Sequence, residues 1–136
     1  MIKLVQVPAT HIDYAWRDGA ACLSEACDYS GGEITGDQLR MILSRGERTL
    51  YCMTEDDKPI GWGVARIDQL PNMRVFFITD LVARGVHFER FFELVKAEAY
   101  KVGCSRVRCA AKPSQARIYQ HKCGFSPVYT TLEVTL

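Results

Sequence analysis

The sequence has 136 residues, of which 24% are charged and 48% hydrophobic, as expected for one globular domain spanning residues 1–136. Its 17 basic and 16 acidic residues leave a formal net charge of +1, which argues against electrostatic attraction to nucleic acid or to an anionic membrane. No apolar run approaches the ~18 residues of a membrane span, and the first residues become polar too soon for a signal peptide. We therefore expect a cytoplasmic protein.

The first part of the chain predicts one strand and two helices. Residues 2–6 are strand-like, and a helix is expected to begin at Thr10 and to continue until a break at residues 29–32. A second, shorter helix is expected after Thr35, which forms a capping box with Gln38.

Residues 49–82 have the pattern of three strands. The strand-like segments 49–53 and 59–67 flank a polar turn at 55–58, which is typical of a hairpin. The segment 74–82 is an almost continuous apolar run, as expected of a central strand that is buried on both faces.

The last third alternates between helices and strands. Apolar residues from Phe88 to Ala99 recur at helical spacing, and a strand over 106–111 and a short helix over 114–123 follow. Residues 127–136 alternate between apolar and polar side chains, which predicts a final strand. The predicted fold is therefore a mixed α/β (α+β) domain, with a mixed sheet of about six strands and helices on both faces.

The cysteines and histidines show no metal-binding pattern. No Cys-x-x-Cys pair occurs, and the histidines do not fall at zinc-finger spacing from the cysteines. No metal site or disulfide is expected. We interpret the six cysteines as small buried apolar residues: Cys22, Cys27, Cys52, Cys104, Cys109 and Cys123.

Four segments carry a resemblance to a known family. They are the acidic hairpin turn with the Ile-Gly pair after it, the end of the apolar strand, the Arg-Gly pair before a helix, and a run from Ala to Gly-Phe: 55–62, 78–82, 84–85 and 116–125. In this order they resemble the GNAT N-acetyltransferases, over roughly residues 48–128. The resemblance implies the GNAT fold and acetyl-CoA as co-substrate.

The sequence also departs from the family pattern. His87 and Glu89 stand where the family's phosphate-binding loop usually has glycine, and Gln120 stands where a tyrosine is a frequent general acid. Pro113 replaces an asparagine whose side chain often helps to hold the pantetheine arm.

The junction before the Phe88 helix is the candidate cofactor-binding segment. The first amides of a helix lack partners and carry partial positive charge, so they attract phosphate. The alternative is a plain strand–helix turn with a solvated arginine, and a carboxylate at Glu89 would repel phosphate unless it points away. The residues predicted to bind the pyrophosphate of CoA are Arg84, Gly85, Val86 and His87.

Acetyl transfer to an amine needs a base to deprotonate the ammonium and an acid to protonate the leaving thiolate. Asp80 is the candidate base and Tyr119 the candidate acid. The alternatives are a strand-end carboxylate bonded to a neighbouring turn, and an aromatic ring packed under a short helix. The family resemblance implies that the backbone of Leu81 and Val82 holds the acyl carbonyl.

These observations predict an acetyl-CoA-dependent N-acetyltransferase that acts on an amine of a small molecule or of a protein, with the acceptor near residues 29–33. The alternative is a catalytically inactive GNAT-fold protein with a binding or structural role, similar to small members that bacteriophages encode. A third interpretation is an α+β binding module unrelated to CoA. A homodimer is left open, and neither nucleic acid nor a membrane is expected as a partner.

Overall fold

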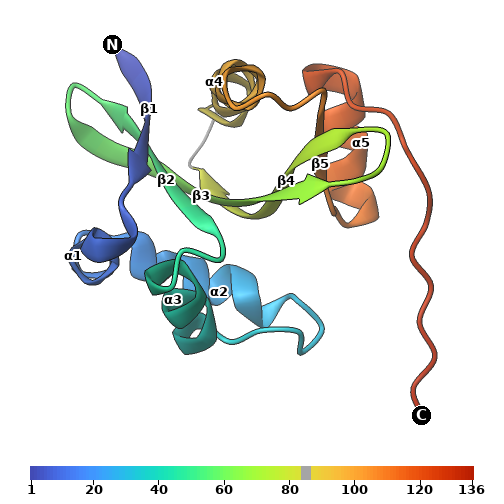
Figure 1. Ribbon diagram of the computed structural model, residues 1–136, viewed down its shortest axis with the longest axis horizontal. Coiled ribbons are helices and arrows are strands. Elements are labelled where there is room, and N and C mark those ends of the chain that lie inside the picture. The colour runs from blue at the N-terminus through green and yellow to red at the C-terminus, as the bar shows by residue number, and fades with distance from the viewer. Residues whose placement is uncertain (84–86) are drawn as a thin grey trace.

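A five-stranded mixed sheet forms the centre of the molecule (Figure 1). The computed structural model describes residues 1–83 and 87–136. The strands follow the order β1-β2-β3-β4-β5 across the sheet; neighbours among the first four are antiparallel, and β5 is parallel to β4. Their bounds are β1 Ile2–Val7, β2 Thr49–Glu55, β3 Lys58–Gln69, β4 Arg74–Ala83 and β5 Arg106–Cys109.

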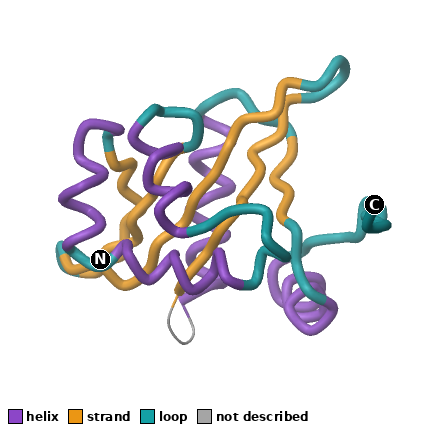
Figure 2. Tube along the Cα trace, turned by 90° about the horizontal axis from the view of Figure 1, so that it is seen from below, coloured by secondary structure: helices purple, strands orange, loops and turns teal. Residues whose placement is uncertain are grey.

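Helices cover both faces of this sheet, as predicted (Figures 1 and 2). One face carries α1 Ile12–Arg17, α2 Leu23–Asp28 and α3 Gly36–Ser44, and the other carries α4 His87–Lys101 and α5 Pro113–Cys123. Each helix layer packs on the sheet around its own hydrophobic core. The first core is built around Leu23, Leu39 and Leu50, and the second around Phe76 and Phe91, all buried to 1% exposure or less.

Two local predictions are confirmed in detail. Thr35 and Gln38 form the capping box of α3: Thr35 Oγ1 accepts from the Gln38 amide at 3.2 Å, and Gln38 Oε1 accepts from the Thr35 amide at 3.0 Å. The hairpin between β2 and β3 turns at Asp56 and Asp57, whose φ angles are 50° and 66°. A tight two-residue hairpin turn needs this left-handed backbone, which aspartate tolerates.

The predicted first helix is interrupted in its middle. The chain forms the 3-10 turn η1 Ala9–His11, then α1, the 3-10 turn η2 Ala20–Cys22, and then α2. The break lies at Gly19, whose φ of 131° is a conformation that residues with a Cβ rarely adopt. A Cβ there would lie 3.5 Å from Trp62 Nε1. Gly19 thus lets the chain turn closely around a tryptophan of the sheet.

The predicted sixth strand is wrong. Residues 127–136 belong to no strand, and the sheet ends at β5. Gly124 ends α5 with a φ of 77°, and the chain then runs away from the body of the molecule as an extended tail (Figure 1). Alternation marks a segment that can form a strand, but a strand needs a neighbour to pair with. The tail has none among the described residues.

Candidate functional site

A β-bulge lies at Thr79 of β4. Its neighbours in sequence, Ile78 and Asp80, pair with consecutive residues of β3, so Thr79 is one residue too many for the ladder. Its hydroxyl lies 3.4 Å from the carbonyl oxygen of Val64 on β3 and 2.8 Å from Asp80 Oδ2. The bulge therefore links the bend in the strand to the orientation of the Asp80 carboxylate.

Strands β4 and β5 separate at this bulge. Their parallel pairing ends where Ile78 lies opposite Cys109, but β4 continues to Ala83 while the chain leaves β5 for α5. A cavity of about 520 Å³ opens there, with Leu81 and Tyr119 among its lining residues. We call it the splay cavity. Its volume is within the ~300–1,000 Å³ of ordinary small-molecule sites.

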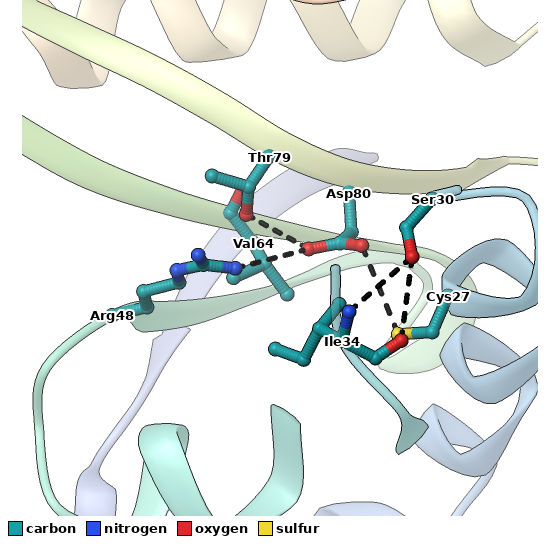
Figure 3. Close-up of polar contacts among 7 residues, drawn as sticks. All are labelled: Cys27, Ser30, Ile34, Arg48, Val64, Thr79 and Asp80. Carbon is teal, nitrogen blue, oxygen red and sulfur yellow. Dashed lines mark hydrogen bonds and ion pairs between the residues drawn. The ribbon is translucent and has the colours of Figure 1, made fainter. Parts of the chain in front are cut away.

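Asp80 lines the splay cavity, and its side chain is only 8% exposed. Figure 3 shows its surroundings: besides Thr79, Arg48 Nη1 lies 3.9 Å from Oδ2, and Cys27 Sγ lies 4.0 Å from Oδ1. Burial raises the pKa of Asp80 above its ordinary value; Thr79 and Arg48 oppose this shift, and Glu33 adds to it. A carboxyl with a raised pKa is a better proton acceptor near neutral pH.

A second cavity meets the splay cavity at Asp80. It has a volume of about 640 Å³, and Glu33 and Glu47 are among its lining residues. We call it the loop cavity, because the loop between α2 and α3 borders it. Ser30 fixes this loop, since its hydroxyl lies 3.4 Å from both the amide nitrogen and the carbonyl oxygen of Ile34 (Figure 3). Asp80 lines both cavities, so ligands in both could reach one carboxylate.

Tyr119 lines the splay cavity from α5. Its ring also packs in an aromatic cluster, with centroids 5.0 Å from Phe92 and 6.0 Å from Phe125. Burial raises the pKa of Tyr119, which keeps the hydroxyl protonated. Gln120, which aligns with the family's tyrosine, lines a different cavity beside the tail. Tyr119 therefore packs in the aromatic cluster and also borders the splay cavity.

Two exposed side chains meet at the rim of the splay cavity. Tyr29 at the end of α2 and Lys112 just before α5 both line it, and Lys112 Nζ lies 4.6 Å from the Tyr29 ring centroid. Exposed cation–π contacts are worth only ~0.5–1 kcal/mol. A bound anion could therefore draw Lys112 away from the ring at little cost.

The structure describes only part of the predicted cofactor-binding segment. Leu81 lines the splay cavity, whereas Val82 packs against the core of α1–α3. His87 is the first residue of α4, and its side chain lies outside the described part of the chain. The other predicted residues also lie outside it: Arg84, Gly85 and Val86.

Glu89, in the first turn of α4, is turned toward α5. Its Oε1 lies 3.7 Å from Lys122 Nζ, and both side chains are about half exposed. The sequence analysis expected the Glu89 carboxylate to repel phosphate at this helix end unless it points away. Lys122 offsets part of its negative charge.

Sequence reasoning missed two neighbours of Asp80. Arg48 comes from the connection before β2 and Cys27 from the last turn of α2, and only the packing of the α1–α3 layer onto β4 brings them to the carboxylate. No local pattern marks either residue. Within residues 1–83 and 87–136, no group of three His, Cys, Asp or Glu side chains could hold a metal ion, and no helix there is long and apolar enough to span a bilayer.

Solved acetyltransferase structures share this architecture. An aminoglycoside acetyltransferase from an uncultured soil metagenomic sample superposes with a TM-score of 0.70 at 10% identity, over 99% of this chain and 96% of its own. Glucosamine-6-phosphate N-acetyltransferase from Arabidopsis thaliana gives 0.66 at 17% identity, over 99% and 98%. A GCN5-related N-acetyltransferase from Ralstonia eutropha JMP134 gives 0.67 at 15% identity, over 99% of each chain.

These likenesses establish the fold and cover nearly the whole chain. No family model matches the sequence, and no curated protein matches it. The structural likenesses alone show that the chain has the fold of the GNAT acetyltransferases, which confirms the predicted fold class.

Proposed function

We propose that this protein is an acetyl-CoA-dependent N-acetyltransferase that acetylates an amine of a small molecule or of a protein. One observation carries the proposal: the Asp80 carboxylate lies where two cavities meet, at the point where β4 and β5 separate. A two-substrate transfer needs such an arrangement, because donor and acceptor must meet at one proton acceptor. A fold shared with acetyltransferases adds support by analogy.

The splay cavity suits the donor. Leu81, Phe92 and Ala110 give it apolar wall for the acyl and pantetheine groups, and Lys112 at its rim offers a cation to a phosphate. The pyrophosphate would then follow to the amino end of α4, next to the predicted Arg84–His87 segment, since helix amides attract phosphate. The loop cavity is left for the acceptor, beside the predicted 29–33 loop.

The chemistry requires two proton transfers. Asp80 takes a proton from the acceptor ammonium, and the freed amine attacks the thioester carbonyl carbon to form the C–N bond. The C–S bond then breaks, and the leaving thiolate takes the proton of the Tyr119 hydroxyl. The raised pKa of Asp80 suits its role, because it favours proton capture. The Tyr119 phenol is protonated near neutral pH and therefore has a proton to give.

A thiol-release assay with acetyl-CoA and a panel of amines tests the proposal. The panel includes polyamines, amino acids, amino sugars and lysine peptides. We expect release that depends on at least one amine, and a kcat reduced by about 10²-fold or more in Asp80→Asn, since proton transfer contributes that much. Asp13→Asn is the matched control and should leave kcat unchanged, because Asp13 is an exposed carboxylate paired with Arg40 at 2.7 Å, away from both cavities.

The pH dependence identifies the base. The wild-type kcat/KM should fall as pH falls through the raised pKa of Asp80, because the protonated carboxyl cannot accept a proton. Asp80→Asn should lack this acidic limb. Equal turnover in Asp80→Asn and wild type would remove the catalytic assignment. Acetyl-CoA binding without transfer to any amine would favour the catalytically inactive alternative.

A further inference from the structure

The walls of the loop cavity carry charges of both signs. Among the described residues that line it are three carboxylates and three guanidinium groups: Glu33, Glu47, Asp80, Arg45, Arg48 and Arg66. A cavity that selects a polyamine or another multiply charged cation is expected to be lined mainly by carboxylates, because binding sites complement the charge of their ligands. The balanced charges here favour a ligand that itself carries both a positive and a negative group.

The three arginines differ in what surrounds them. Arg66 is already paired within the sheet, since its Nε lies 3.0 Å from Asp68 Oδ1. Arg45, the residue after α3, is exposed to solvent. The side chain of Arg48 is only 23% exposed, and within the described part of the chain its guanidinium has one polar partner, the Asp80 carboxylate. Arg48 is thus the cation that lies in the interior of the loop cavity, beside the proposed base.

The ion pair between Arg48 and Asp80 is an open one. Figure 3 shows the guanidinium directed at the carboxylate, but Nη1 lies 3.9 Å from Oδ2, whereas a charge-assisted N–H···O hydrogen bond measures ~2.7–2.9 Å. The Thr79 hydroxyl, at 2.8 Å, already donates to Oδ2. Arg48 therefore keeps its N–H donors available for a second carboxylate, and a half-buried cation gains from such a partner.

This cation limits which amines can approach the base. The acceptor ammonium has to lie next to Asp80, and there it also meets the positive charge of Arg48, which repels it. An amine without a nearby anionic group has nothing to offset this repulsion. An α-amino acid carries its carboxylate on the carbon that bears the amine, so its two charges match a carboxylate and a guanidinium that lie side by side.

We propose that the acceptor is a free α-amino acid, whose ammonium binds Asp80 while its carboxylate binds Arg48. This inference rests on the proposed function, because it names the acceptor of that same reaction. The product is then an N-acetyl amino acid. The apolar part of the cavity wall suits an apolar side chain such as that of leucine or methionine, and it is supplied by Ile34, Met41 and Ile42.

The proposal makes lysine side chains and protein amino termini poor acceptors. The ε-amine of a lysine within a peptide has no carboxylate beside it, and the α-amine of a peptide has a neutral amide in that place. Neither can bind Arg48 as a carboxylate does. Arg48 is therefore the residue that determines specificity, and Asp80 remains the candidate base.

Kinetics with three matched amines test the acceptor. L-leucine, L-leucinamide and isopentylamine share the side chain and the amine, but only L-leucine has a carboxylate. With saturating acetyl-CoA, we expect kcat/KM for L-leucine to exceed that for L-leucinamide by about tenfold to a hundredfold, as for the loss of a hydrogen bond between charged groups, and mainly through KM. Isopentylamine, spermidine and a lysine peptide should be no better than L-leucinamide. L-methionine and L-methioninamide form a second pair.

Substitution of Arg48 separates recognition from structure. Arg48→Gln should remove the preference for L-leucine over L-leucinamide and change the turnover of the amide little. Arg48 also lowers the pKa of Asp80, but this effect acts on both substrates and leaves their ratio unchanged. Arg48→Lys keeps the charge and should restore part of the preference. Arg40→Gln is the control, because Arg40 pairs with Asp13 at 2.7 Å and does not line the loop cavity.

The outcomes distinguish this inference from the proposed function. Transfer to spermidine or to the lysine peptide in preference to both amino acids would overturn the inference and leave the acetyltransferase standing. A preference for L-leucine that survives in Arg48→Gln would also overturn it.

Calorimetric titration in the presence of CoA covers a protein that transfers no acetyl group. Binding of L-leucine or L-methionine that is lost in Arg48→Gln, without turnover of any amine, would support the amino-acid site and contradict the proposed function. Absence of binding by both amino acids at about 10 mM, where even a millimolar Kd is detected, together with absence of their turnover, would overturn the inference.

Discussion

The two halves of β4 differ in what surrounds them. Residues 74–78 pair with β3 on one side and β5 on the other, and Val75 and Phe76 are buried to 1% exposure. Residues 79–83 keep β3 but not β5, start with a bulge, and are only half-buried. One apolar strand thus supplies the core with its first half and the candidate site with its second. The strand passes from one role to the other where its pairing with β5 ends.

Substitution of a core residue in the first half should have the largest effect. Phe76→Ala leaves a cavity under α4, and we expect it to lower the free energy of unfolding by ~3–5 kcal/mol, measured by urea denaturation. Phe77→Ala is the neighbour for comparison, because its half-buried ring faces the Arg66 guanidinium at 4.4 Å; a loss of ~1–2 kcal/mol is expected. Equal losses in the two variants would contradict the difference between a buried Phe76 and a half-buried Phe77.

Substitution of the candidate acid should affect rate rather than stability. Tyr119→Phe keeps the ring contacts with Phe92 and Phe125 and removes only the hydroxyl. We expect kcat to fall by about tenfold or more, with little change in the unfolding midpoint. Tyr100→Phe, at a ring that is 84% exposed on α4, is the control. A stability loss without a rate loss would assign Tyr119 to packing alone.

The smallest expected effect is a shift of a pH profile. Thr79→Val removes the hydroxyl 2.8 Å from Asp80 Oδ2. That hydrogen bond lowers the pKa of Asp80, so its removal should raise the pKa and move the acidic limb of kcat/KM to higher pH. Thr49→Val, at a half-buried position on β2, serves as control. A shift to lower pH, or none, would mean that Thr79 does not support the ionised carboxylate.

The raised pKa of Asp80 makes the stability of the protein depend on pH in a definite direction. A carboxyl whose folded-state pKa is raised binds its proton more tightly in the folded state, so the stability of the protein falls as pH rises through that pKa. The candidate base therefore costs stability when it is ionised, unlike the core residues of the first half. Such a cost is common among groups that are kept for function.

The sequence predicted the elements whose signals are local. The apolar run of β4, the helical spacing in α4 and the capping box at Thr35 each lie within one segment, and each appears at the expected place. Sequence reasoning could single out Asp80, because it is the carboxylate within that apolar run; its role as a base stays a prediction. The partner Arg48 could not be singled out in this way, since tertiary packing alone brings it to Asp80.

Two predicted elements were wrong because their structure depends on residues that are distant in sequence or on a pairing partner, which a local pattern does not show. The apolar spacing from Ile12 to Ala26 fits one helix, but Gly19 turns the chain around Trp62, which lies on a strand far along the sequence. The alternation in residues 127–136 fits a strand, but strand formation depends on a pairing partner. The bulge at Thr79 belongs to the same class, because it results from the register with β3.

Calorimetric titration with acetyl-CoA tests the central claim most directly, namely that the separation of β4 and β5 forms the donor site. Ala110 borders both the splay and loop cavities, so Ala110→Trp should fill the opening, whereas Ala97→Trp on the exposed side of α4 should not. We expect a Kd on the order of micromolar for wild type and Ala97→Trp, and no measurable binding for Ala110→Trp. Absence of wild-type binding at millimolar acetyl-CoA, or equal binding by both tryptophan variants, would contradict the account.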